Sequence, residues 1–170
     1  MDELLIEAKD KKEELLKNFK TIILSTINKE NLPNSSYAPS VVDKNGDFYI
    51  YISELSKHTT NLLSNPLASL MIIEDESKTE NIFARKRFTM NSKAVTIDRD
   101  SGEWNLKMDL MENKFGEPIK FLKTMTDFHL FKITPNDGLL VHGFARAFRF
   151  VGPGLNEVKY LNDKGHTQDK

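Results

Sequence analysis

Residues 43–47, with the sequence DKNGD, constrain the fold of this chain more than any other short stretch. An Asn-Gly pair flanked by apolar segments is the strongest short-range signal for a β-hairpin, because both residues tolerate the positive φ angles of a tight turn. The segment that follows, 48–53 (FYIYIS), alternates Phe48, Ile50 and Ile52 with two tyrosines. Such alternation is typical of a strand with two different faces. We therefore expect antiparallel strand pairing in this part of the chain.

Six further segments have the apolar, β-branched composition of strands. They are residues 21–27 (TIILSTI), 35–42 (SSYAPSVV), 67–74 (LASLMIIE), 84–97 (ARKRFTMNSKAVTI), 127–135 (DFHLFKITP) and 138–150 (GLLVHGFARAFRF). The run Pro135-Asn136-Asp137-Gly138 predicts a turn between the last two.

Three segments are expected to be helical. Residues 1–18 place apolar side chains on one side of a helical wheel and predict an N-terminal amphipathic helix over about 2–18. Residues 56–64 predict a short helix with Ser56 as a possible N-cap. Residues 100–123 predict helix with a break near Gly116 and Pro118.

The order of these segments favours one domain, residues 1–170, with a mainly β fold and peripheral helices. Hairpins dominate and there is no regular alternation of strands and helices, so a parallel Rossmann sheet is disfavoured. Neither a GxGxxG motif nor a P-loop is present to bind phosphate. An antiparallel barrel fits best.

The composition limits the classes of binding partner that we expect. The net charge is -1, and acidic and basic residues are interspersed along the chain, so there is no general affinity for nucleic acid. No apolar run approaches the roughly 20 residues of a membrane span, and the acidic N-terminus is unlike a secretory signal. The chain contains no cysteine, which excludes disulfides and thiolate metal sites. We expect a cytoplasmic protein with no membrane or nucleic-acid partner.

Four stretches carry a resemblance to a known family: SKHTTNLLSNPLASLMIIEDE, NIFARKRFTMNSKA, DFHLFKITPNDGLLVHGFARAF and the tail with His166. Together they resemble the antiparallel split β-barrel of the flavin-binding, pyridoxamine-phosphate-oxidase-like proteins. Within that class they are similar to haem-utilization proteins of the HugZ/HutZ type, over about residue 19 to the C-terminus.

The resemblance implies a homodimer with haem at the subunit interface. A C-terminal tail, residues 152–170, would supply His166 as the ligand of the haem iron. Arg87, with Arg85, would contact the haem, and Asp127 would hydrogen-bond the ligating imidazole of the neighbouring subunit. His58 matches the family's histidine before the short helix. Ala145 departs from the family pattern, where a glycine is expected.

Each of these residues also has a plainer interpretation. Strand alternation would place Arg85 and Arg87 on one face, which suits a haem propionate or a flavin phosphate equally, but basic residues also protect exposed strands. His58 could cap or border its helix. For His129 and His142, a packed or hydrogen-bonded imidazole is the preferred interpretation. Polar tails such as that of His166 are ordinarily frayed.

The sequence thus favours a haem-degrading oxygenase that cleaves the porphyrin to a biliverdin-type product and releases iron and CO. Haem would be both cofactor and substrate. The sequence does not identify the electron donor. One alternative is an FMN-dependent oxidoreductase of the pyridoxamine-phosphate-oxidase type, and another is a haem storage or transfer protein without turnover.

Overall fold

The structure is a computed structural model that describes residues 2–144 and 146–161. Its elements are, in chain order, α1 Asp2–Asn18, β1 Thr21–Ile27, β2 Pro33–Pro39, β3 Val41–Val42, β4 Phe48–Ser53, α2 Lys57–Ser64, β5 Leu67–Ile73, η1 Glu76–Lys78, η2 Ile82–Ala84, β6 Arg87–Ile97, α3 Gly102–Phe115, α4 Glu117–Leu122, β7 Phe128–Val141, β8 Ala147–Val151, η3 Pro153–Leu155 and β9 Glu157–Tyr160.

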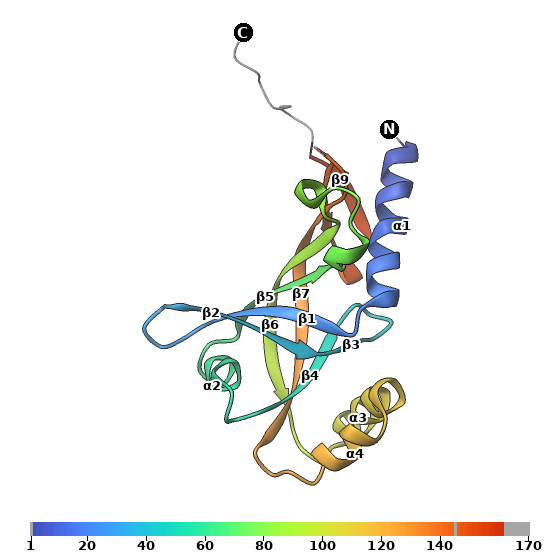
Figure 1. Ribbon diagram of the computed structural model, residues 1–170. Coiled ribbons are helices and arrows are strands. Elements are labelled where there is room, and N and C mark those ends of the chain that lie inside the picture. Colours follow the sequence, from blue (N-terminus) through green and yellow to red (C-terminus); the bar gives the residue numbers. More distant parts are fainter. Residues whose placement is uncertain (1, 145, 162–170) are drawn as a thin grey trace.

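The strands of the described residues form one nine-stranded sheet in the order β2-β1-β5-β6-β7-β4-β3, with β8 on β7 and β9 on β8. Every pair is antiparallel. The sheet curls into a half-barrel, with α1 along one side and α3 and α4 at one end (Figure 1). The prediction of a mainly β, antiparallel split barrel with peripheral helices is confirmed.

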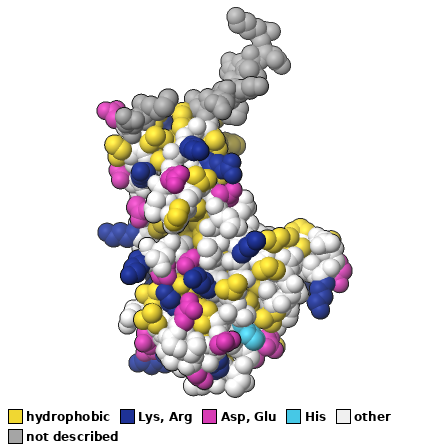
Figure 2. Space-filling view, turned by 180° about the vertical axis from the view of Figure 1, so that it is seen from behind, with side chains coloured by type: hydrophobic (Ala, Val, Ile, Leu, Met, Phe, Trp, Pro, Cys, Tyr) yellow, Lys and Arg dark blue, Asp and Glu magenta, His cyan; other side chains and the backbone are white. Residues whose placement is uncertain are grey.

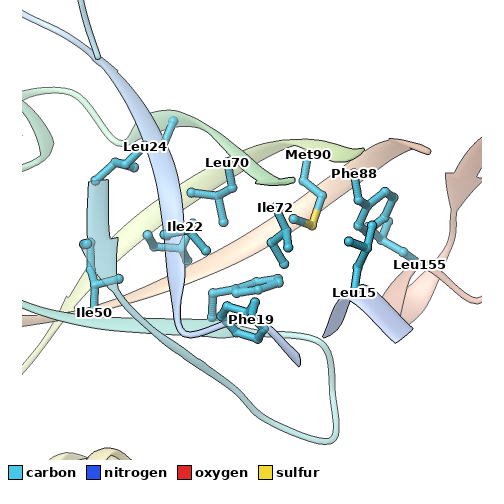
Figure 3. Close-up of a cluster of buried hydrophobic side chains, with 14 of the residues drawn as sticks. Leu15, Phe19, Ile22, Leu24, Ile50, Leu70, Ile72, Phe88, Met90 and Leu155 are labelled. Carbon is cyan, nitrogen blue, oxygen red and sulfur yellow. The ribbon is translucent and has the colours of Figure 1, made fainter. Parts of the chain in front are cut away.

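The larger hydrophobic core lies between α1 and one face of the sheet. Leu15, Phe19 and side chains from β1, β4, β5 and β6 point toward one another there (Figure 3). Lys12 is buried with them, and its ammonium group donates a hydrogen bond to the carbonyl oxygen of Leu155, 3.1 Å away. This contact satisfies the charged end of a side chain whose stem covers apolar surface, and it attaches α1 to the chain just before β9.

A second core lies on the opposite face of β4 and β7, beneath α3 and α4. Trp104, Met108 and Met111 of α3 pack there on Tyr49 and Tyr51 of β4. The alternation in FYIYIS therefore serves two cores, since its phenylalanine and isoleucines face the first. No helix of residues 2–144 or 146–161 is long and apolar enough to cross a membrane.

The hairpin at residues 43–47 forms as expected. Val41 and Val42 pair with Tyr49 and Phe48, and Gly46 has a φ of 83°. The carboxylate of Asp43 accepts backbone N–H groups inside the turn. The turn chemistry alone therefore identified this element.

The turn predicted at residues 135–138 is wrong, because β7 continues through it. Asn91 pairs with Asp137 and Ser92 with Pro135, so Asn136 is the extra residue of a β-bulge. Proline is tolerated because β4 pairs with β7 only up to Ile133, and β8 pairs with it only from residue 138 onward. Gly138 leaves room for the Phe88 ring, since a Cβ at position 138 would lie 2.5 Å from that ring.

Three other boundaries differ from expectation. The strand expected over 35–42 is divided into β2 and β3. The strand expected from Ala84 begins at Arg87, because residues 82–84 form a 3₁₀ turn that Asn81 caps. The C-terminal tail was expected to begin at residue 152, but residues 153–160 include η3 and β9.

Candidate ligand-binding site

The predicted site residues fall into two groups at opposite ends of β7. Arg87 begins β6 and pairs with Val141, the last residue of β7. Asp127 immediately precedes the first residue of β7. At about 3.3 Å per residue, the 14 residues of this strand separate the two ends by roughly 40 Å. Arg87 and Asp127 of one chain therefore cannot contact one small ligand. We name these two regions the arginine end and the aspartate end.

At the arginine end the two guanidinium groups have different surroundings. Arg85 precedes β6 and donates to the carbonyl oxygen of Glu74 at 2.7 Å and to the carboxylate of Glu76 at 3.0 Å. Arg87 donates from Nη1 to the carbonyl oxygen of Arg85 at 3.0 Å, and it has no acidic partner within the described residues. Arg85 lies outside β6, contrary to expectation, so strand alternation does not decide whether the two side chains share a face. Arg87 is the better placed to bind an external anion.

Exposed apolar side chains surround this end. Phe83 and Ile82, just before Arg85, are 89% and 58% exposed, and Phe144, after β7, is 71% exposed. Hydrophobic side chains are visible at this end of the molecule in Figure 2. Contiguous exposed apolar groups mark binding surfaces. An arginine beside aromatic surface fits the propionates and the flat apolar ring of a haem.

At the aspartate end, the carboxylate of Asp127 is half-buried and held from one side. The Ser53 hydroxyl donates to its Oδ2 at 2.6 Å, and the N–H of Glu54 donates to its carbonyl oxygen at 2.9 Å. His58 follows Glu54 by four residues, in the first turn of α2, and has no hydrogen-bond partner in the described part of the chain. Burial lowers the pKa of His58, so its imidazole is neutral near pH 7. Ser56 occupies the N-cap position but makes no side-chain capping bond.

The structure adds residues that the sequence did not identify. Ser53 contacts Asp127, and His129 contacts Glu54 with 2.5 Å between Nε2 and Oε1. Both contacts follow from the register of β4 and β7, in which Ile52 pairs with His129. Strand register between distant segments is not readable from one sequence, so no sequence signal marked Ser53 or Glu54.

His129 and His142, which the sequence assigned to strands, both make contacts within the protein. His142 is buried and stacks on Phe148 with 5.2 Å between ring centroids. Burial lowers its pKa, an effect that Glu7 opposes and Arg146 reinforces. His129 is hydrogen-bonded, as described above. Both match the plainer interpretation, a packed or hydrogen-bonded imidazole.

The predicted iron ligand, His166, lies outside the described residues, as does Ala145. The last described residue is Leu161, whose N–H donates to the carbonyl oxygen of Ala147 at 2.9 Å. Ala147 pairs with Val141, which pairs with Arg87. Residue 161 therefore lies about three strand spacings, or about 14 Å, from Arg87.

Comparison with known proteins defines the class of this fold. Residues 8–142 match the family model of pyridoxamine 5'-phosphate oxidase. The match covers most of the chain, and the chain belongs to this family.

Among individual proteins, the chain is similar to the heme oxygenase HutZ of Vibrio cholerae, with 39% identity over 88% of this chain and 84% of that protein. The crystal structure of HutZ, described there as a heme storage protein, superposes with a TM-score of 0.76 over 81% of this chain and 96% of that one. Campylobacter jejuni ChuZ is 31% identical, with a TM-score of 0.85 over 96% of this chain and 66% of ChuZ. The chain is thus a HutZ homologue, as the sequence resemblance predicted.

Proposed function

We propose that this protein binds haem between the two subunits of a homodimer and degrades it oxidatively. The observation that carries the proposal is the separation of Arg87 and Asp127 along β7. Two copies related by a two-fold axis can bring the arginine end of one beside the aspartate end of the other. The names of HutZ as a heme oxygenase and a heme storage protein support haem as the ligand.

The number of residues between Leu161 and His166 limits which residues His166 can reach. His166 is five residues beyond Leu161, and five residues span at most about 18 Å. This reach covers the distance of about 14 Å to Arg87, but not the length of β7, roughly 40 Å, that separates the arginine end from Asp127 of the same chain. His166 and Arg87 of one subunit would therefore meet Asp127 and His58 of the partner subunit.

The outer face of the sheet supports dimer formation. Ile23, Tyr37, Leu67 and Leu139 point away from the larger core and are 36%, 67%, 47% and 40% exposed. Hydrophobic side chains extend over the projecting β1–β2 hairpin in Figure 2. Apolar groups along a curled sheet suit a second copy of the same surface, because a two-fold interface is self-complementary.

The residues of the chain have distinct parts in this function. Arg87 would bind a propionate through its planar donors, while Phe83 and Phe144 would cover the ring and limit water. Asp127 would accept the second N–H of the His166 imidazole, which fixes its tautomer and raises its basicity. Bound haem would supply the iron that activates O₂ and the ring that is cleaved to a biliverdin-type product, iron and CO. The electrons would come from a separate donor in the cytoplasm.

Mixing of subunits tests the composite site. Neither His166→Ala nor Asp127→Ala homodimers should retain a wild-type haem spectrum. A heterodimer of the two variants would contain one site with both residues intact and one site lacking both. We expect half of the wild-type haem sites to return in the purified heterodimer. A heterodimer in which neither site recovers would exclude the arrangement, and a monomeric mass at micromolar concentration would exclude the dimer.

Two alternatives share this site. Storage without turnover is favoured by the description of the HutZ crystal structure, and an FMN oxidoreductase by the family model. A Soret band without bound flavin in haem-treated protein would exclude the flavin alternative. Addition of a reductant in air then distinguishes the others, since an oxygenase forms a verdin-type product and free iron.

A further inference from the structure

Ser53 is the last residue of β4 and lies beside Asp127 because it pairs with Phe128, the next residue. Its hydroxyl is 2.6 Å from Oδ2 of Asp127. This is a short bond of the kind formed between a hydroxyl donor and a carboxylate. No motif in the sequence marks Ser53.

The direction of the hydroxyl hydrogen follows from the other contact of Ser53. Its oxygen also accepts the backbone N–H of Leu55 at 3.1 Å. A hydroxyl has one hydrogen to donate, so the bond with Asp127 takes it while Leu55 uses a lone pair. The surrounding backbone is equally fixed, because the N–H of Glu54 donates to the Asp127 carbonyl and that of Ser56 to the Ser53 carbonyl. Ser53 is thus a rigid donor to Asp127.

The carboxylate of Asp127 is therefore asymmetric. Oδ2 accepts from Ser53, while Oδ1 has no hydrogen-bond partner in the part of the chain that the structure describes. A carboxylate held at one oxygen has its other oxygen aimed in a fixed direction. An oxygen held in this way can accept the free N–H of a metal-bound imidazole and orient its ring.

We propose that Ser53 is a positioning residue, which aims Asp127 at the imidazole N–H of the haem-ligating histidine from the partner subunit. This inference rests on the proposed function. The side chain would touch neither haem nor the reacting atoms. Its effect would pass through Asp127 to the strength of the iron–histidine bond.

The test compares four variants of the full chain. Ser53→Ala removes the donor, Ser53→Thr keeps a hydroxyl, and Asp127→Asn removes the charged acceptor. Ser36→Ala is the matched control, because the Ser36 hydroxyl also makes one hydrogen bond, to the Leu24 carbonyl in β1. The readouts are the iron–histidine stretching frequency of the ferrous haem complex, the haem affinity, and the carboxyl ¹³C signal of Asp127 in the haem-free protein.

We expect Asp127→Asn to lower the stretching frequency and to weaken haem binding by about 10-fold or more, as loss of the hydrogen-bond partner of a metal-bound imidazole does. Ser53→Ala should shift the frequency in the same direction by less and move the haem-free Asp127 signal. Ser53→Thr and Ser36→Ala should keep wild-type values. A wild-type frequency in Ser53→Ala, beside a shifted one in Asp127→Asn, would overturn the part of Ser53 while leaving the proposed function standing. Absence of a histidine-bound haem in the wild-type protein would instead overturn the proposed function, and this inference with it.

Discussion

The arginine end and the aspartate end share one strand but differ in almost every property. The arginine end has guanidinium groups and exposed aromatic side chains, and it rests on the larger core beneath α1. The aspartate end has a tethered carboxylate and imidazoles, and it lies toward the second core beneath α3 and α4. Each subunit thus contains both kinds of group, but at two ends that are too far apart to contact the same ligand. A ligand that needs both kinds requires two copies.

The largest expected effect concerns the core behind the arginine end. Phe88 is 1% exposed and packs edge-on against Phe150, with ring centroids 5.5 Å apart. Phe88→Ala should lower the free energy of unfolding by about 3–5 kcal/mol, because it leaves a cavity. Urea unfolding measures this loss. Trp104→Ala in the second core is the counterpart, and hydrogen exchange should show each variant loosening its own end first.

Arg87→Ala should weaken haem binding by about 1.5–3 kcal/mol, since it removes a charge-assisted contact. Haem titration followed by the Soret band measures the change. Arg149→Ala is the control, because Arg149 lies two strands away and is ion-paired with Asp137 at the surface. Its loss should cost less than about 1 kcal/mol of stability and leave haem affinity unchanged. Equal affinities in the two variants would mean that Arg87 has no part in haem binding.

At the aspartate end, Glu54→Gln tests the neighbouring hydrogen bond between Glu54 and His129 separately from Asp127. Glu54 and His129 are 52% and 30% exposed in their side chains, and pairs of this kind contribute about 1 kcal/mol or less. We expect a small change in thermal stability and no change in haem affinity. A large loss of affinity would instead place Glu54 in the binding machinery beside Asp127.

The smallest effect concerns pH and involves one histidine from each end. Burial lowers the pKa of both His58 and His142 in the folded protein, so the unfolded chain takes up protons first as pH falls. Stability should be level above the unfolded value of about 6.5 and decline below it. Urea unfolding at pH 7.5 and 5.5 measures the decline. His142→Gln should reduce it, and an undiminished decline would assign the dependence to other groups.

Local chemistry explains what the sequence could predict. The hairpin at residues 43–47, the amphipathic α1 and the two faces of β4 depend on neighbours in the chain, and all were predicted. The run at 135–138 has turn composition, yet β6 and the Phe88 ring impose a bulged strand on it. Arg85 was misplaced because Asn81 caps a 3₁₀ turn where strand was expected. The residues Asp127 and Arg87 were singled out by resemblance, but their separation depends on the length of β7, which the mistaken turn concealed.

The attachment of α1 to the end of the chain has a consequence for how the protein is made. The first helix packs on β9 (Figure 1), and Lys12 donates to the carbonyl oxygen of Leu155. During synthesis the apolar side of α1 leaves the ribosome long before its last covering residues. Completion of the barrel must wait for residues near 160, while the hairpins between can pair as they emerge. A nascent chain halted before η3 would lack Leu155, which belongs to the same core cluster as Leu15 and Phe150, so the apolar surface of that core would stay open to chaperones and proteases.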